Sequence, residues 1–420
     1  MNKSTESLSR PRLSILGVGD FPDGGATSQR LYLLARILNE EMGQTDVWVL
    51  HAASKTVVPG NSAVTGSYGG VRFRYLCGRT VRPRGLGQAI LDTMQGIFVA
   101  ARLLLTRSQR PDVLVIYTPV LAKFIVPLVL ARLLRIPIIV EACEVFSTST
   151  DVVGTGLMRR LANGGQALME RKLPAMASGL IVISRRIKDY YRALGFAEES
   201  IYLLPVLTDI ERYQGEGTVV SHLVGEQYFL NSGSFAEKDG IAYLIDAMVA
   251  VRADYPGLKL VFTGFAGEVI KRNILTRAGV GGAGWIIFTG MLNRDELIWC
   301  YKRATGLLCC RSNSDYANYG FPTKLAEYLS CARPIIATRV GDVELYLTDG
   351  QNAFLAQPEN VPDIAEAMRR LLRDPDRALS IGQRGAKVAA QWFDYRNHIL
   401  PVTEFVRKAT MVVQDLPHPP

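Results

Sequence analysis

Two ionisable side chains stand three residues apart in Tyr316–Thr338, the stretch of this chain that most clearly predicts chemistry. Lys324 and Glu327 follow Gly320, which opens a turn, and Pro322, which suits a first helical position. The unpaired N–H groups and the dipole of a helix start favour an anion, and Lys324 adds a full positive charge. The carboxylate of Glu327 can accept hydrogen bonds from both hydroxyls of a vicinal diol, such as that of a ribose. The alternative is a surface helix with a Lys324–Glu327 ion pair.

The helix that presents these side chains is predicted from the spacing of its apolar residues. They recur every three or four positions, at Phe321, Leu325, Tyr328 and Leu329. Lys324 and Glu327 fall on a different face, so one face can pack while the other meets a ligand. Residues 335–338 then predict a short buried strand.

The stretch resembles the nucleotide-sugar site of the retaining glycosyltransferases of family 4, which have the GT-B fold. The family pattern is two glutamates separated by seven residues around a G-F/L-P/S core, then G-x-P-V-V-A. Glu327 is the second glutamate, Tyr319 stands in the place of the first, and Ala332 replaces the later glycine. The resemblance implies a metal-independent transferase of the polysaccharide-assembly type that takes a sugar from a nucleoside diphosphate.

The resemblance also implies the residues of a donor site. They are Gly24, Gly25, Ser234, Lys238, Thr289, Gly290, Gly320, Phe321, Thr323, Lys324 and Glu327. The family loop G-R-L…K-G corresponds here to Gly233, Ser234 and Lys238, and the arginine is absent. Lys238 is a point charge suited to a diphosphate, and its alternative is a solvated loop lysine. With Lys324 and backbone N–H groups it would stabilise the leaving diphosphate without Mg²⁺.

The candidate catalytic residues are Lys238, Glu144 and Tyr319. Glu144 follows the buried strand 138–140, which in the family often ends in a histidine; Cys143 holds that place here. A carboxylate there could orient an acceptor hydroxyl or help to take its proton. A structural ion pair with one of the many arginines is an equal alternative.

Strands alternate with helices on both sides of a polar segment, which predicts the α/β class with two doubly wound, Rossmann-like domains. We expect an acceptor-side domain at 11–205, a linker at 206–226 and a nucleotide-sugar domain at 227–396. By family analogy, a last helix at 397–410 crosses back onto the first domain.

Positive charge is concentrated in the first half of the chain. Residues 1–212 hold 26 Lys and Arg against 17 Asp and Glu, while residues 213–420 hold 22 of each. This predicts an anionic partner for the first half, either acidic lipid or a phosphorylated substrate; simple solubility is the alternative. The candidate acceptor-side or membrane-side residues are Arg30, Arg79, Arg82 and Arg84. Nucleic acid is not expected, since no helix-turn-helix, zinc or RNP-type signature occurs.

Two strongly apolar helices are predicted at 89–105 and 119–134. Neither reaches eighteen uncharged apolar residues, so core helices are favoured over membrane spans, with an interfacial helix as the alternative. The first twelve residues do not resemble a signal peptide, and the cysteines and histidines match no disulfide or zinc pattern. We therefore expect a cytoplasmic chain, peripheral on the inner face of the membrane, with no metal or cofactor beyond the nucleotide sugar.

The expected function is sugar transfer, with retention, to a glycan acceptor, lipid-linked, in bacterial-type surface polysaccharide biosynthesis. Departures from the family pattern at Tyr319, Ser234 and Cys143 keep two alternatives open. One is a nucleotide-sugar-binding scaffold without turnover, and the other is a non-hydrolysing nucleotide-sugar epimerase. The donor sugar, its base and the acceptor are left open.

Overall fold

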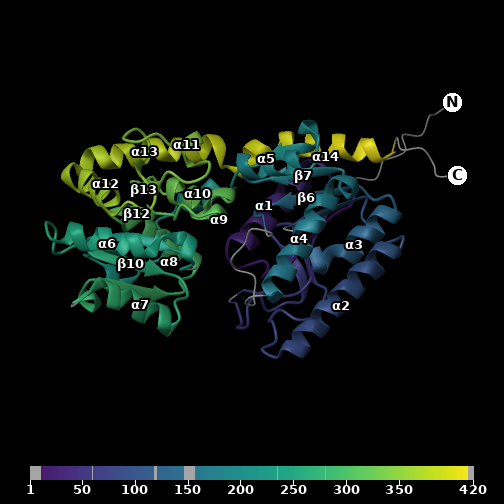
Figure 1. Ribbon diagram of the computed structural model, residues 1–420, viewed down its shortest axis with the longest axis horizontal. Coiled ribbons are helices and arrows are strands. Elements are labelled where there is room, and N and C mark those ends of the chain that lie inside the picture. Colours follow the sequence, from purple (N-terminus) through teal and green to yellow (C-terminus); the bar gives the residue numbers. More distant parts are fainter. Residues whose placement is uncertain are drawn as a thin grey trace. The chain divides into compact units, whose positions relative to one another are not determined.

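The computed structural model of the 420-residue chain describes residues 11–414 apart from 59, 118–120, 146–156, 234 and 280 (Figure 1). The chain forms two compact units. Unit 1 comprises Met1–Leu204 with Tyr395–Pro420, and unit 2 comprises Pro205–Asp394. Ser234, one of the expected donor-site residues, lies outside the described residues.

Unit 1 is built on an eight-stranded sheet in the order β3-β4-β2-β1-β5-β6-β7-β8. Its strands are β1 (Leu13–Gly17), β2 (Thr45–Val49), β3 (Thr65–Tyr68), β4 (Val71–Tyr75), β5 (Val113–Tyr117), β6 (Ile138–Ala142), β7 (Gly179–Val182) and β8 (Ile201–Leu203). Every pair is parallel except β3 with β4. Because β1 lies between β2 and β5, the crossovers reverse direction at β1, and ligands bind open sheets at the carboxyl ends of such strands.

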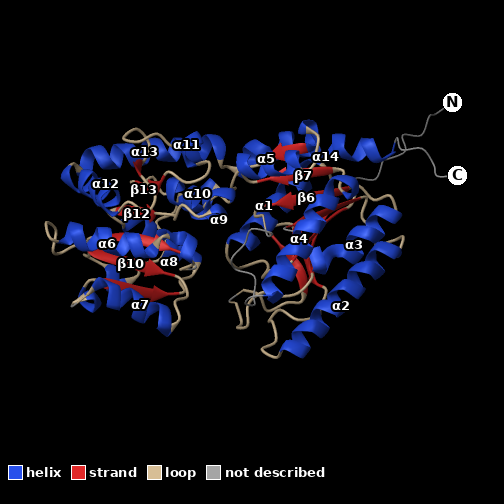
Figure 2. Ribbon diagram, in the orientation of Figure 1, coloured by secondary structure: helices blue, strands red, loops and turns tan. Residues whose placement is uncertain are grey.

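Helices cover this sheet because its central strands are apolar on both faces (Figure 2). They are α1 (Ala26–Glu41), α2 (Leu86–Leu105), α3 (Leu121–Leu133), α4 (Leu157–Met176), α5 (Arg185–Ala193) and α14 (Ile399–Gln414). All five residues of β1 and of β5 are buried. Helix α14 packs on α1, and its Phe405 contacts Tyr202 with ring centroids 5.5 Å apart. The C-terminal helix therefore completes the layer begun by the first helix.

Unit 2 is built on a six-stranded, wholly parallel sheet in the order β11-β10-β9-β12-β13-β14. Its strands are β9 (Tyr228–Ser232), β10 (Lys259–Thr263), β11 (Ile286–Gly290), β12 (Gly306–Cys309), β13 (Ile335–Thr338) and β14 (Phe354–Ala356). The chain runs from β9 to β11 on one side and then crosses to β12 on the other. The reversal therefore lies between β9 and β12.

The helices of unit 2 are α6 (Ile241–Arg252), α7 (Glu268–Ala278), α8 (Arg294–Arg303), α9 (Asp315–Tyr319), α10 (Thr323–Ser330), α11 (Val343–Tyr346), α12 (Val361–Arg373) and α13 (Pro375–Trp392). Helix α6 packs on α12, and α10 packs on α13. Segment 206–226 belongs to unit 2 and carries two short 3-10 helices, Ile210–Tyr213 and Ser221–Leu223, with Tyr213 and Leu223 buried.

Candidate functional site

Helix α10 follows the carboxyl end of β12 after a loop and the short helix α9. Its apolar face is buried through Leu325, Tyr328 and Leu329. Pro322 caps the helix instead of occupying its first turn, so Thr323 is the first helical residue. Lys324 and Glu327 are only partly buried, since they stand away from the packed face. The predicted division of the helix into two faces is therefore present.

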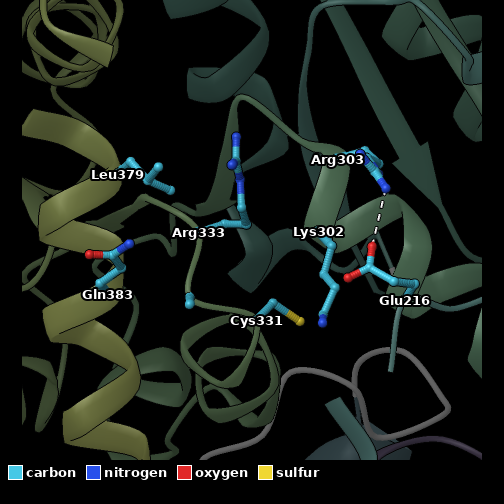
Figure 3. A pocket seen from close by; sticks show the side chains of 8 residues that line it. Glu216, Lys302, Arg303, Cys331, Arg333, Leu379 and Gln383 are labelled. Atoms are coloured by element: carbon cyan, nitrogen blue, oxygen red, sulfur yellow. Dashed lines mark hydrogen bonds and ion pairs between the residues drawn. The ribbon is translucent and has the colours of Figure 1, made fainter. Parts of the chain in front are cut away.

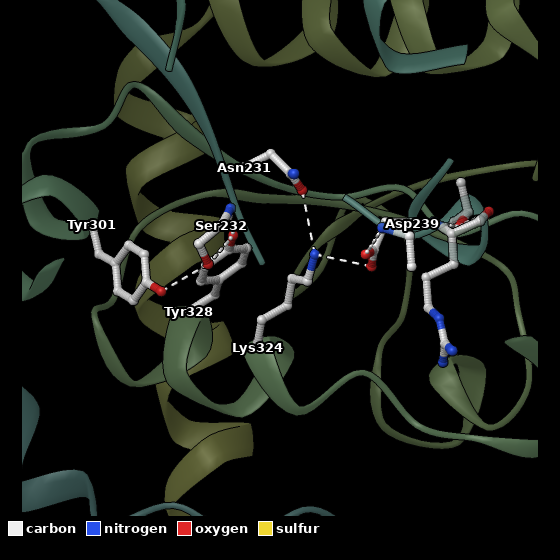
Figure 4. A network of polar contacts seen from close by, with 9 residues as sticks. Asn231, Ser232, Asp239, Tyr301, Lys324 and Tyr328 are labelled. Carbon is white, nitrogen blue, oxygen red and sulfur yellow. Dashed lines mark hydrogen bonds and ion pairs between the residues drawn. The ribbon is translucent and has the colours of Figure 1, made fainter. Parts of the chain in front are cut away.

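The Lys324 ammonium reaches across to the end of β9 (Figure 4). Its Nζ lies 3.2 Å from Asp239 Oδ1 and 3.4 Å from Asn231 Oδ1. Burial acts to raise the pKa of Asp239, but Lys324 and then Arg311 outweigh it and keep that pKa low, so the carboxyl is ionised. Asp239, rather than Glu327, is thus the carboxylate that pairs with Lys324.

The carboxyl group of Glu327 lies near the hydroxyls of two tyrosines. Burial raises its pKa, while the Arg294 guanidinium and the hydroxyls of Tyr213 and Tyr301 oppose the rise. Burial removes water that would donate hydrogen bonds to this carboxylate. Hydroxyl groups of a ligand that donate to it in place of that water would therefore stabilise it.

A hydroxyl network fixes α10 and α8 to the end of β9 (Figure 4). Ser232 N donates to Tyr328 Oη at 2.8 Å, and Ser232 Oγ lies 2.8 Å from Tyr301 Oη and 3.0 Å from Tyr328 Oη. Tyr301 and Tyr328 also pack edge to face, with ring centroids 5.0 Å apart. These contacts hold the end of β9, α8 and α10 in one fixed arrangement.

Two further cations surround the same edge of the sheet. Lys238 lies on the 3-10 helix Glu237–Asp239, with Nζ 4.3 Å from the ring centroid of Tyr316. Arg311 lies two residues after the end of β12 and is buried, and its guanidinium comes within 3.6 Å of where a Cβ on Gly320 would lie. Three cations thus gather near one carboxylate, an arrangement that can hold an anion.

Arg311 is absent from the predicted donor-site residues. The sequence contained one signal for it, its place at the carboxyl end of a buried strand, but the family pattern carries no arginine there. Its backbone is fixed by Thr338, since Arg311 N donates to Thr338 Oγ1 at 2.8 Å.

The remaining expected donor residues of unit 2 fall into two groups. Thr289 and Gly290 end β11, and Gly264 N donates to Gly290 O at 2.9 Å, which ties that end to β10. Phe321 is buried against the rings of Tyr346 and Phe393 and so packs the core. Gly320 ends α9, and the side chain before it, Tyr319, is partly buried.

The expected residues of unit 1 are also placed. Gly25 caps α1, directly after Gly24, at the carboxyl edge of the sheet. Glu144 follows β6 and is partly buried. The structure brings Lys238, Gly320, Thr323, Lys324 and Glu327 together in unit 2, while Gly24, Gly25 and Glu144 belong to unit 1.

The prediction that Arg30 contacts an acceptor or a membrane is wrong. Arg30 is 3% exposed, its Nε lies 2.5 Å from Glu141 Oε1, and it donates to Leu204 O at 3.0 Å. It fell on the helix that begins at the glycine loop, but its side chain faces the sheet. Arg79 and Arg84 are exposed and Arg82 is partly buried.

A pocket of about 230 Å³ occurs elsewhere in unit 2 (Figure 3). Arg303 and Arg333, which line it, precede β12 and β13, so the pocket lies at the amino edge of the sheet. Arg303 Nη2 pairs with Glu216 Oε2 at 3.1 Å. This pocket is therefore separate from the site at the carboxyl edge. Within the described part of the chain, no group of three His, Cys, Asp or Glu side chains is arranged to hold a metal ion.

Two doubly wound α/β units, each with polar side chains at the carboxyl edge of its sheet, define the GT-B class of fold. A family model described as glycosyl transferase 4-like domain matches residues 25–206, and one described as glycosyl transferases group 1 matches residues 226–374. The chain belongs to this family of GT-B glycosyltransferases.

Curated relatives agree with that assignment. The uncharacterized glycosyltransferase MJ1178 of Methanocaldococcus jannaschii is 25% identical over 183 residues, 43% of this chain and 48% of that protein. The MMP alpha-(1->4)-mannosyltransferase of Mycolicibacterium hassiacum is 22% identical over 234 residues, 55% of this chain and 53% of that protein. The matches thus span about half the length of these two relatives.

Solved structures share the fold. Sucrose-phosphate synthase from Thermosynechococcus elongatus superposes with a TM-score of 0.73 at 16% identity, covering 96% of this chain and 100% of that one. Anabaena Alr3699/HepE in complex with UDP-glucose gives 0.67 at 15% identity, with 96% and 100% covered.

Proposed function

We propose that this protein transfers a sugar, with retention, from a nucleoside diphosphate to a lipid-linked glycan acceptor in surface polysaccharide biosynthesis. The observation that carries the proposal is the convergence of Lys238, Lys324 and Arg311 at the β9/β12 reversal, beside Glu327. The cations suit a diphosphate, and the carboxylate suits a ribose diol. Alr3699/HepE, which shares the fold, was crystallised with UDP-glucose, so UDP-sugars are the first donors to test.

In this proposal the chemical step is the loss of the diphosphate. Its negative charge grows as the glycosidic bond to phosphate breaks, and fixed cations stabilise that charge without reorganising. Lys238 and Lys324 would act as point charges, and the N–H groups that begin α10 at Thr323 and Lys324 would add donors. Pro322 has no N–H to contribute. Glu144, in unit 1, remains the candidate for orienting the acceptor hydroxyl.

Incubation with a panel of nucleotide sugars tests the proposal. A transferase releases nucleoside diphosphate and forms a glycoside, an epimerase changes the sugar while it stays on the nucleotide, and a scaffold binds without either change. NMR of the product compares its anomeric configuration with that of the donor, and inversion would overturn the proposed retention. Activity that is abolished by a chelator and restored by a divalent cation would overturn the proposed metal independence.

We also propose that the acceptor is reached at an anionic membrane surface. Helix α2 exposes a series of large apolar side chains: Leu86, Ile90, Leu91, Met94, Phe98 and Leu105. The neighbouring α3 exposes four more: Ile125, Val126, Val129 and Leu133. Apolar faces beside basic loops are typical of proteins that bind membranes reversibly. The expectation that both helices are core helices thus holds for only one side of each.

Helix α2 also differs from the expectation about membrane spans. It is the one helix in the described part of the chain that is long and apolar enough to cross a membrane, judged by length and composition alone. Only a third of its apolar window is buried. Its buried side packs on α3 and carries Asp92, so we favour a helix that lies on the membrane over one that crosses it.

A further inference from the structure

Three basic side chains gather at the carboxyl edge of the unit 1 sheet. His51 follows β2, Arg82 lies in the loop after β4, and Lys123 is in the first turn of α3, which follows β5. Arg82 N donates to Ser54 O at 2.8 Å, which joins the loops after β4 and β2. The three residues thus come from both sides of β1, where the crossovers reverse. This is the position at which an open α/β sheet binds its ligands.

His51 is a neutral acceptor that holds the Lys123 ammonium. His51 Nδ1 lies 2.8 Å from Ala52 O, and a carbonyl can only accept, so Nδ1 carries the proton. His51 Nε2 is therefore bare and accepts from Lys123 Nζ at 2.9 Å. An ammonium has three N–H donors, which leaves two of them on Lys123 without a partner among the described residues.

The nearby carboxylates are engaged elsewhere. Asp20 Oδ1 accepts from the N–H groups of Ala53 and Ser54, each at 3.1 Å. Asp92 Oδ1 accepts from Gln88 and lies 3.8 Å from Arg79 Nε. In the described part of the chain neither Lys123 nor Arg82 forms an ion pair. The cluster therefore keeps an uncompensated positive charge.

The titration behaviour agrees with this geometry. Burial and then the Arg82 charge lower the pKa of Lys123 to about 8. Burial, Lys123 and Arg82 lower the pKa of His51 to about 4, although the hydrogen bond to the Ala52 carbonyl and then the charge of Asp92 oppose the shift. A partly buried ammonium beside a guanidinium is destabilising on its own, and the attraction of both cations to a bound anion would offset that repulsion.

We propose that Lys123 and Arg82 bind the phosphate or diphosphate group of the acceptor, with His51 as the residue that positions Lys123. Arg82 would make a bidentate contact with phosphate oxygens, and Lys123 would donate its two remaining N–H groups. That the ligand is an acceptor rests on the proposed function; the anion site itself does not. Arg84 lies exposed in the same loop and is not part of the proposed anion site.

Calorimetric titration of the full chain with inorganic pyrophosphate, with and without saturating UDP, tests the site. Pyrophosphate binding that is lost in Lys123→Met is assigned to the unit 1 site. We expect Lys123→Met and Arg82→Gln to weaken it about tenfold or more, and Arg84→Gln to leave it within about twofold. Equal binding by the wild type and Lys123→Met overturns the proposal. Lys123→Met should also unfold at the same temperature or higher without anion, because it removes a like-charge contact.

Two arms distinguish the sources of the phosphate. Geranyl diphosphate that binds more tightly than pyrophosphate would mark a lipid diphosphate, and a monosaccharide phosphate that does so would mark a soluble acceptor. Loss of the preferred ligand in Lys123→Met is required in either arm.

A pH profile separates a positioning role for His51 from a merely structural one. Sulfate keeps its charge near neutrality, so its binding should weaken as pH rises through about 8, where Lys123 loses its proton. Besides Arg82, the ionisable groups around His51 and Lys123 are Asp20, Cys77, Arg79 and Asp92. His51→Leu should weaken sulfate binding and shift the pH at which half of that binding is lost. His51→Gln keeps a hydrogen-bond acceptor, so it should restore the wild-type affinity and the wild-type midpoint pH. A midpoint that stays in place in Lys123→Met overturns the assignment.

The proposal and the function fail in different ways. If no nucleotide binds but pyrophosphate binding still depends on Lys123, the proposed function is wrong and the anion site stands. If sugar transfer occurs and Lys123→Met binds anions and acceptor like the wild type, the anion site is wrong and the function stands.

Discussion

Glu327 is partly buried on α10, with tyrosine hydroxyls and the Arg294 guanidinium around it. If it holds the ribose, Glu327→Gln keeps the shape of the side chain and removes the charge from two hydrogen bonds. We expect nucleoside diphosphate affinity to fall by about 1.5–3 kcal/mol. Calorimetric titration measures the loss, with Glu268→Gln on the exposed side of α7 as the control. Unchanged affinity would remove Glu327 from the site.

Lys238 is expected to act on the diphosphate and not on the nucleoside. Lys238→Ala should therefore lower turnover strongly, while it leaves the affinity for a nucleoside without phosphates nearly unchanged. The control is Lys259→Ala, a lysine at the amino end of β10 whose Nζ donates to Gly284 O. Steady-state rates with the preferred donor decide the matter, and an intact rate in Lys238→Ala would place the diphosphate elsewhere.

Arg30 illustrates a buried ion pair whose role is structural. Arg30→Met leaves Glu141 inside unit 1 without its partner, and we expect a loss of about 3–5 kcal/mol in the free energy of unfolding, measured with urea. Burial already raises the pKa of Glu141, and the opposing charge is then gone. The folded variant binds the proton more tightly than the folded wild type, so the loss relative to the wild type should grow as pH rises above the already raised pKa of Glu141 in the wild type.

The double variant Arg30→Met, Glu141→Leu is the matched comparison. It removes both charges and should recover most of the stability. A stable single variant with reduced vesicle binding would instead return Arg30 to the membrane surface.

At the scale of elements, periodic helices and buried strands were predictable, and small-residue elements were not. The apolar face of α10 and the buried strands of both sheets follow from spacing alone. Helix α13 was missed because glycines take the place of its apolar residues. A Cβ on Gly382 would lie 2.5 Å from Arg333 C, so the helix packs closely against backbone, and its buried face has only Ile381 as a large apolar residue beside glycine and alanine.

The two-residue turn between β3 and β4, and the short α9, were missed for a related reason. Strand β3 is largely exposed, so its sequence lacks the alternation that marks a half-buried strand. In α9, the cap formed by Ser314, whose Oγ accepts from Ala317 N at 3.2 Å, lies in a polar stretch that predicts a loop equally well. Partners distant in the chain, such as Asp239 for Lys324, cannot be inferred from local patterns.

The exposed face of α2 gives a prediction at the same scale. Met94 and Phe98 are 60% and 67% exposed, so Met94→Ser with Phe98→Ser should not disturb the core. We expect the variant to bind anionic vesicles more weakly, because about 25 cal/mol is lost for each Å² of apolar surface no longer buried in the lipid. Flotation with vesicles measures binding, and Val249→Ser on α6 is the control. Equal flotation of the variant and the wild type would exclude this face.

The whole molecule divides its charge between its units. Unit 1 holds 28 Lys and Arg against 17 Asp and Glu, while unit 2 holds 20 against 22. The protein should therefore pellet with vesicles rich in anionic lipid at low salt and dissociate at high salt. Replacing Arg84, Arg102 and Arg107, which flank or end α2, with Ser should cost roughly 1 kcal/mol of binding for each residue. If the wild-type protein does not bind anionic vesicles at low salt, the membrane proposal is overturned.

Unit 1 takes its last helix from the far end of the chain, and this has a consequence for biosynthesis. Residues 205–394 form an uninterrupted unit and have all their partners as soon as they leave the ribosome. Helix α1 is made among the first elements, yet the helix that packs on it, α14, is made last. Val402, Phe405 and Val406 of α14 are buried in the finished protein. The nascent amino-terminal unit must therefore wait with an uncovered apolar surface until translation of the second unit is complete, and it is this waiting chain that a chaperone would recognise.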